Sequence, residues 1–220
     1  MTARSDQPDA EPIFDEAFRR TLTQLLAWRR DVRSFDPRPV DPAALAAALS
    51  SFDLAPSVGN SQPWRLVTVN DPERRVRIRD SFERSNASAL RAQATERAGL
   101  YASLKLAGLD QAPVHLAVFC DEDCEQGHGL GTRTMPETLA YSTVAALTTF
   151  WLAARAHGIG VGWVSIIEPD VVSAVLDVPA EWRLIAYLCV GYPAAADDVP
   201  DLERRSWQAR APLASKLIRR

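Results

Sequence analysis

Apolar residues recur at helical spacing in two long segments of the chain. The first segment predicts a helix from about residue 14 to Arg29 with one apolar face, formed by Phe14, Phe18, Leu22, Leu25 and Leu26. The second is the longest apolar stretch, residues 139–154, which predicts a buried core helix reaching about Ala156. Thr134 and Glu137 precede it at capping-box spacing, so we expect the helix to begin there.

Short apolar runs and turn residues predict the other elements. Asp41–Pro42 and Asp71–Pro72 each place a capping carboxylate before a proline, which predicts two more helix starts. The second of these opens a charged stretch to residue 104 that favours exposed helices or a mobile excursion. Strands are predicted at residues 65–69, 114–119, 161–166 and 184–190, with a short helix at 169–176.

This pattern indicates an α+β fold, with helices around a small sheet. We expect a disordered tip at residues 1–12 and a single domain over residues 13–220. The tail from residue 198 has little apolar periodicity, so we expect it to lie across a surface and to reach a partner subunit.

Composition and charge narrow the class of protein. The 220 residues are 47% hydrophobic and 24% charged, which is typical of globular proteins. A net charge of −3 provides no general attraction to nucleic acid. The first twelve residues lack the apolar run of a signal peptide, and residues 139–154 are too short to span a bilayer. Three cysteines without framework spacing favour reduced thiols, so we expect a cytoplasmic protein with no membrane partner.

Several motifs suggest chemistry that their context does not support. The glycines of residues 158–162 follow a helix and enter a strand, the reverse of a dinucleotide-binding turn. The glycines of residues 127–131 lack the lysine of a phosphate-binding P-loop. Cys120, Cys124 and His128 have no second cysteine pair, so we expect no metal.

Two segments remain as candidates for binding. In the first, Arg29, Arg30 and Arg33 surround Asp31, and guanidiniums bind phosphate with two parallel hydrogen bonds. The same cluster could be a solvated helix end, where cations complement the helix dipole. In the second, a rigid loop presents short donors and acceptors from Ser57, Asn60, Ser61 and Gln62. Together they suggest a phosphorylated aromatic ligand, of which FMN is one.

RRDVRSF at residues 29–35, followed by APSVGNSQPW at 55–64, resembles the FMN-binding signature of the nitroreductase-like flavoproteins. Residues 101–121, 130–138, 151–166 and 188–193 resemble one branch of that family, the 5,6-dimethylbenzimidazole synthases of cobalamin biosynthesis. The resemblance covers residues from about 25 to 210.

The resemblance implies a homodimer with a central, mainly antiparallel sheet and FMN at the subunit interface. It implies that Arg29, Arg30 and Arg33 bind the phosphate and ribityl chain and that the loop of Ser57, Asn60, Ser61 and Gln62 edges the flavin ring. It also places Lys105 and Leu106 in a lid near the flavin, Ser165 near the ring, and Arg205 and Gln208 in a tail that closes on the phosphate.

The residue at position 31 distinguishes the two activities that the resemblance implies, nitro- or flavin reduction and flavin fragmentation. Ordinary nitroreductases resemble this chain but typically carry serine there, and a carboxylate would disfavour an anionic reduced flavin. In the synthase branch, reduced FMN and dioxygen are substrates, supplied with the help of a separate flavin reductase. The products are 5,6-dimethylbenzimidazole and D-erythrose 4-phosphate. Cleavage of the ribityl chain requires removal of a hydroxyl proton, so Asp31 is the expected acid/base and Ser165 orients the flavin or a proton path. The alternatives are an NAD(P)H-dependent nitroreductase or flavin reductase and a flavin-binding protein without turnover.

Overall fold

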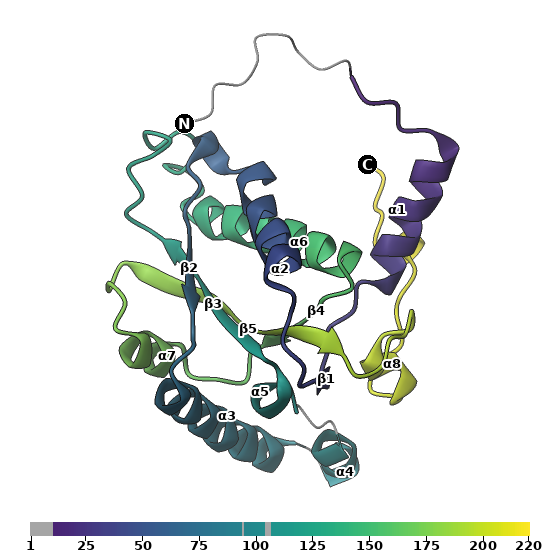
Figure 1. Cartoon of the computed structure of the whole chain (residues 1–220), viewed down its shortest axis with the longest axis vertical. Coiled ribbons are helices and arrows are strands. Elements are labelled where there is room, and N and C mark those ends of the chain that lie inside the picture. The colour runs from purple at the N-terminus through teal and green to yellow at the C-terminus, as the bar shows by residue number, and fades with distance from the viewer. Residues whose placement is uncertain (1–10, 94, 104–106) are drawn as a thin grey trace.

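A computed structural model describes residues 11–93, 95–103 and 107–220 (Figure 1). Its five strands pair in the order β1-β5-β3-β2, and β4 also pairs with β5. Every pairing between these strands is antiparallel, which confirms the predicted α+β class and mainly antiparallel sheet. The strands are β1 Phe35–Asp36, β2 Trp64–Thr68, β3 Val114–Asp121, β4 Gly160–Val164 and β5 Trp182–Pro193.

The four predicted strands are confirmed in position, with changes at their ends. β4 ends at Val164, so Ser165 lies just outside the sheet. β5 continues to Pro193, three residues beyond its predicted end, because its last two residues pair with β1. β1 has only two residues, too few for a periodic pattern to predict it.

The helices are α1 Glu16–Trp28, α2 Pro42–Leu49, α3 Pro72–Ala92, α4 Thr95–Ser103, α5 Gly108–Gln111, α6 Thr138–Ala156, α7 Pro169–Leu176 and α8 Asp201–Arg204. Both predicted aspartate caps are confirmed, because Asp41 accepts from the Ala43 amide at 3.2 Å and Asp71 accepts from the Glu73 amide at 2.9 Å. No described helix is long and apolar enough to cross a membrane.

The predicted capping box of the long apolar helix is wrong. α6 begins at Thr138, and Glu137 occupies its cap position without a side-chain capping bond. The Thr138 hydroxyl instead donates to the Met135 carbonyl. The turns of the preceding glycine-rich loop continue through Glu137, so Thr134 lies too early to cap the helix.

The sheet is covered on both faces, as Figure 1 shows. On one face, Leu188 of β5 packs with Leu147 and Phe150 of α6, beside α2. On the other face, Tyr187 packs with Ile78 of α3 and Val172 of α7. The alternating residues of β5 therefore serve two separate cores.

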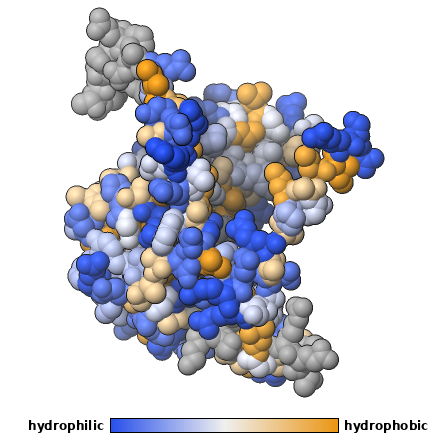
Figure 2. All heavy atoms as spheres, turned by 90° about the vertical axis from the view of Figure 1, so that its right-hand side faces the viewer, coloured by the Kyte–Doolittle hydropathy of each residue, from blue (hydrophilic) through white to orange (hydrophobic). Residues whose placement is uncertain are grey.

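The first predicted helix is confirmed, but its apolar face is not covered by this chain. Asp15 caps α1 by accepting from the Phe18 amide at 2.8 Å. Phe18 is 44% exposed, Leu22 40% and Leu26 51%. α1 stands away from the sheet beside the C-terminal segment, and Figure 2 shows apolar side chains on the projecting parts of this side of the molecule. An unpartnered apolar face of this kind marks an interaction surface.

The sequence predicts a disordered tip at the N-terminus and a tail that lies across a surface at the C-terminus. Most of the tip predicted to be disordered, residues 1–10, lies outside the described residues. The tail forms α8 and then a contact between the rings of Trp207 and Tyr101, whose centroids are 6.2 Å apart. Residues 208–220 are exposed, and among them Arg210 lines a small pocket with Arg29, Arg30 and Asp31.

Candidate active site

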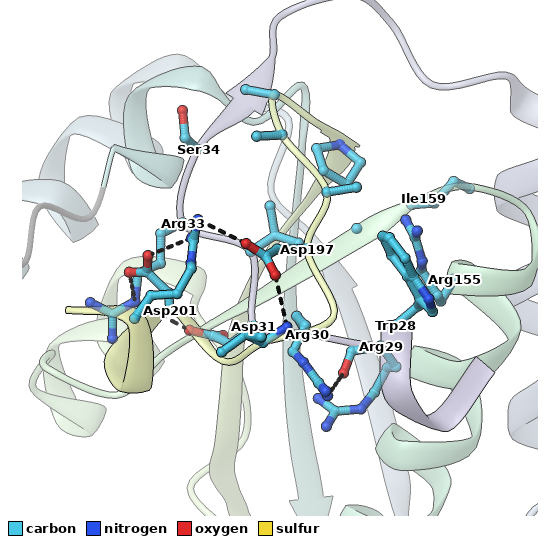
Figure 3. Close-up of a pocket in the computed structure, with 18 of the residues that line it drawn as sticks. Trp28, Arg29, Arg30, Asp31, Arg33, Ser34, Arg155, Ile159, Asp197 and Asp201 are labelled. Atoms are coloured by element: carbon cyan, nitrogen blue, oxygen red, sulfur yellow. Dashed lines mark hydrogen bonds and ion pairs between the residues drawn. The ribbon is translucent and has the colours of Figure 1, made fainter. Parts of the chain in front are cut away.

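A pocket of about 400 Å³ lies at the end of α1 (Figure 3). The segment between α1 and β1 contributes Arg29, Arg30, Asp31 and Arg33 to its lining. α6 contributes two further side chains, and the segment after β5 closes the other side. The predicted arginine cluster therefore faces a pocket together with its one carboxylate.

Two glycines of β4 fix the position of this segment. The Val32 amide donates to the Val161 carbonyl at 3.0 Å, so the backbone of the cluster lies directly on β4. A Cβ at Gly162 would lie 2.1 Å from the Val32 carbonyl oxygen, and one at Gly160 would lie 2.7 Å from the Val32 side chain. These glycines therefore permit close backbone approach.

Asp31 is held by hydrogen bonding and by charge. Its Oδ1 accepts from the Trp163 amide at 2.8 Å, and its Oδ2 lies 3.6 Å from Nε of Arg33. The side chain is 39% exposed. Protein atoms around the carboxyl nevertheless raise its pKa above the ordinary value, and the Trp163 amide, Arg33 and Arg29 limit that rise. The carboxylate is thus fixed in place, with its pKa above the ordinary value.

The guanidiniums of the cluster have different partners. Arg29 lies over the Trp151 ring, 4.8 Å from its centroid. Burial and the neighbouring charge of Arg30 lower the pKa of Arg29, although an arginine stays protonated. Arg30 donates Nε to the Asp198 carbonyl at 3.0 Å. Backbone oxygens and aromatic faces therefore orient cations that remain available to an anion.

α8 closes one side of the pocket. Its first residue, Asp201, pairs with Arg204 and Arg205 at 2.9 Å and lies 3.9 Å from Nε of Arg33. The predicted tail residue Arg205 therefore lies in the pocket lining, whereas Gln208 does not. Gln208 donates to the neighbouring Ala209 carbonyl at 3.3 Å.

The structure does not bring the other predicted site residues into the pocket. Ser165 is exposed, follows Trp163 by two residues and does not line the pocket. Lys105 and Leu106 lie outside the described residues, so their predicted place in a lid stays a prediction.

The predicted binding loop is a rigid turn. Ser57 Oγ accepts from the Gln62 amide at 3.1 Å, and Gln126 donates to the Asn60 carbonyl at 2.8 Å. Asn60 and Gln62 both have positive φ angles, of 55° and 46°. The Ser61 hydroxyl is buried and has no hydrogen-bond partner within the described residues. The loop therefore holds a polar group that a ligand or a partner chain could satisfy.

One chain does not bring the loop and the arginine cluster into the same pocket. The loop is tied to the beginning of α6, where the Val58 amide donates to Ser142 Oγ at 3.0 Å. Arg29 is stacked on Trp151, nine residues further along the same helix. This separation is about 14 Å along the axis.

Several residues that line the pocket are not predicted from the sequence. Trp151 belongs to the helix that the sequence predicts to be buried, but it is half-buried and lines the pocket beneath Arg29. Arg155 follows it by one helical turn and lies 5.9 Å from the ring centroid of Trp28. The i, i+4 spacing of Trp151 and Arg155 was the available signal. The other missed residues are Asp197, Asp201 and Arg204.

Relatives of known name share this architecture. Residues 26–192 match the Nitroreductase family. A 5,6-dimethylbenzimidazole synthase of Rhodospirillum rubrum is 57% identical over 201 residues, which are 91% of this chain and 95% of that protein. Another, of Rhodobacter capsulatus, is 46% identical over 199 residues, covering 90% and 96% of the two chains.

Solved structures agree with this grouping. The crystal structure of an oxidized iodotyrosine deiodinase bound to FMN and 3-iodo-L-tyrosine has a TM-score of 0.68 and 26% identity, covering 80% of this chain and 91% of that one. A nitroreductase-like protein of Streptococcus mutans shares the fold, with a TM-score of 0.69 at 19% identity over 91% and 98% of the chains. The chain belongs to the nitroreductase family and, within it, to the branch of enzymes named 5,6-dimethylbenzimidazole synthase.

Proposed function

We propose that this enzyme consumes reduced FMN and dioxygen and releases 5,6-dimethylbenzimidazole, the lower ligand of cobalamin, and D-erythrose 4-phosphate. The observation that carries the proposal is the fixed Asp31 carboxylate within a pocket of guanidiniums. The names of the two synthases from Rhodospirillum rubrum and Rhodobacter capsulatus support the same product. We further propose a cytoplasmic enzyme that receives reduced FMN from a separate flavin reductase.

The residues of the pocket and those of the separate loop suit the two ends of FMN. Arg29, Arg30, Arg33 and Arg205 supply the cations that a phosphate group needs. The loop of Ser57, Asn60, Ser61 and Gln62 supplies donors and acceptors for the ring edge, including the buried Ser61 hydroxyl without a partner. Ser165 would contact the ring at the end of β4.

A second copy of the chain would complete the site. The loop and the arginine cluster contact α6 at points about 14 Å apart along its axis, and in a single chain they do not line one pocket. The uncovered apolar face of α1 borders the pocket at Trp28 and supplies a surface for association. We therefore propose a homodimer in which the arginines of one protomer and the loop of its partner bind the same FMN.

In this proposal, Asp31 moves the proton that carbon–carbon cleavage requires. Reduced FMN supplies electrons to dioxygen when it is bound. The Asp31 carboxylate accepts a proton from a ribityl hydroxyl, while its bond from the Trp163 amide keeps the oxygen in place. A raised pKa favours this role because the group is then a stronger base.

The direct test mixes the protein with anaerobically reduced FMN, admits air and measures 5,6-dimethylbenzimidazole by chromatography with mass detection. We expect the product to form in amounts that increase with enzyme concentration. Recovery of only oxidised FMN and peroxide, from protein shown to bind reduced FMN, would contradict the proposal. Oxidation of NAD(P)H with a nitroaromatic acceptor would then support the reductase alternative.

A further inference from the structure

One guanidinium in the pocket is shared by two carboxylates from distant parts of the chain. Nε of Arg33 lies 3.6 Å from Asp31 Oδ2 and 3.9 Å from Asp201 Oδ2. Both distances fall within ion-pair range, but neither is as short as the 2.9 Å that separates Asp201 from Arg205. Arg33 therefore forms a short ion pair with neither carboxylate (Figure 3).

Asp201 is well placed to hold Arg33 in this shared position. Its side chain is 17% exposed, and Arg204 and Arg205, on the same short helix, hold its carboxylate at 2.9 Å. Burial of Arg33 to 23% exposure restricts the guanidinium to the space between the two acids. A charge pair that is partly shielded from water interacts more strongly than one on the open surface.

We propose that Asp201 is a positioning residue for Asp31, which draws Arg33 away from it and so keeps the Asp31 carboxylate able to accept a proton. This inference rests on the proposed function of Asp31 and assigns the regulation of that same group. An arginine paired fully with Asp31 would stabilise its anion and make it a weak base. Asp201 prevents that pairing by sharing the cation.

The other groups around Asp31 do not perform this role. Arg29 and Arg30 precede it on the same segment, and Arg29 is stacked on Trp151 of α6. β4 contributes the neutral Trp163 amide. From β5, Cys189 is buried, which raises the pKa of its thiol to about 12, so it is uncharged at neutral pH. The remaining charged groups that line the pocket are Arg155 of α6, Asp197 of the segment after β5, and Arg204 and Arg205 of α8. Arg210, which follows α8, lines an adjoining pocket together with Asp31.

The test is a carbon-13 NMR titration of the aspartate carboxyls in the full-length protein without FMN, with the Asp31 signal identified by its loss in Asp31→Asn. In Asp201→Asn, we expect the pKa of Asp31 to fall by about one unit, a tenfold change in acidity, because Arg33 becomes free to pair with it. Asp201→Glu restores the negative charge and is expected to return the value toward that of the original protein.

Two control variants distinguish this mechanism from a general effect of removing a negative charge from α8 or of disturbing its structure. Glu203→Gln removes the same charge from α8, but Glu203 has no ion pair within the described residues, so the pKa of Asp31 is expected to stay within about 0.2 units. In an Arg33→Gln background, Asp201→Asn is expected to leave Asp31 unchanged, because the cation that transmits the effect is absent.

Equal shifts in Asp201→Asn and Glu203→Gln, or a shift that persists without Arg33, would overturn the assignment. So would an unchanged Asp31 in Asp201→Asn. The titration needs no turnover, so its outcome is independent of whether 5,6-dimethylbenzimidazole forms. If the titration succeeds but no product appears, the linkage stands and the proposed function fails.

Discussion

The Asp31 carboxylate accepts a hydrogen bond of 2.8 Å from the backbone amide of Trp163, a residue 132 positions further along the chain. Because the donor is a main-chain group of β4, no side-chain substitution at position 163 other than proline removes it. The sheet itself therefore sets the position of the proposed acid/base.

Asp31→Asn tests that role with little change in shape. The amide oxygen of asparagine can still accept from the Trp163 amide, but it cannot take up a proton at neutral pH. We expect FMN to bind with similar affinity while product formation falls by roughly 10²–10⁴-fold. FMN fluorescence titration and product chromatography measure the two quantities. An unchanged product yield would remove Asp31 from the mechanism.

Gly162→Ala tests the contact between the arginine segment and β4. The added methyl group would meet the Val32 carbonyl oxygen at 2.1 Å, so the segment must move away from the strand. We expect the free energy of unfolding to fall by about 1–3 kcal/mol, with weaker FMN binding. Gly99→Ala is the matched control, because a Cβ there has no neighbour within 4 Å. Similar losses in both variants would argue against the specific contact.

Leu22→Asp tests the uncovered face of α1. Leu22 is 40% exposed in the single chain, and a charge there would oppose burial against a second copy. We expect sedimentation analysis to show a shift from dimer to monomer, with FMN binding lost in parallel. Gln24→Glu, on the opposite side of the helix, is expected to retain both properties. A dimer that persists in Leu22→Asp would place the interface elsewhere.

His115 predicts a specific dependence of stability on pH. It is 1% exposed, its Nδ1 lies 2.8 Å from the Tyr187 hydroxyl, and burial with the nearby charge of Arg75 lowers its pKa to about 4. The unfolded chain, with a pKa near 6.5, therefore binds more protons below that pH. The stabilisation is complete above about pH 6.5 and is lost as the pH falls toward 4, by about 3 kcal/mol.

Denaturant titrations at pH 7 and pH 4.5 measure this loss. His115→Gln cannot titrate, so its stability is expected to depend less on pH over that interval. The exposed His157 provides the control, because His157→Gln is expected to keep the original dependence. An equal dependence in all three proteins would assign the effect to other groups.

The sequence predicts local elements well and their partners poorly. The strands follow from short apolar runs, and the caps at Asp41 and Asp71 follow from local chemistry that needs no tertiary contact. The start of α6 does not, because the packing of the preceding loop on residues 58–61 determines it. Periodicity shows that α1 has an apolar face, but it does not show which chain covers that face.

The same distinction applies to the candidate site, where residues that are adjacent in sequence are predictable and residues from distant segments are not. The arginine cluster and Asp31 are adjacent in sequence, so their proximity was predictable. Trp151, Asp197 and Asp201 join them only through the path of α6 and of the segment after β5, which no local pattern encodes. Their side chains are also of types that occur commonly in cores and on surfaces.

The placement of the loop and the arginines near opposite ends of α6 has a genetic consequence. In the proposed dimer, a chain defective at Arg33 and a chain defective at Asn60 each form inactive homodimers. A mixed dimer of the two places both defects in one site and leaves the other site with the intact half of each chain. Two loss-of-function alleles would therefore complement each other when they are expressed together.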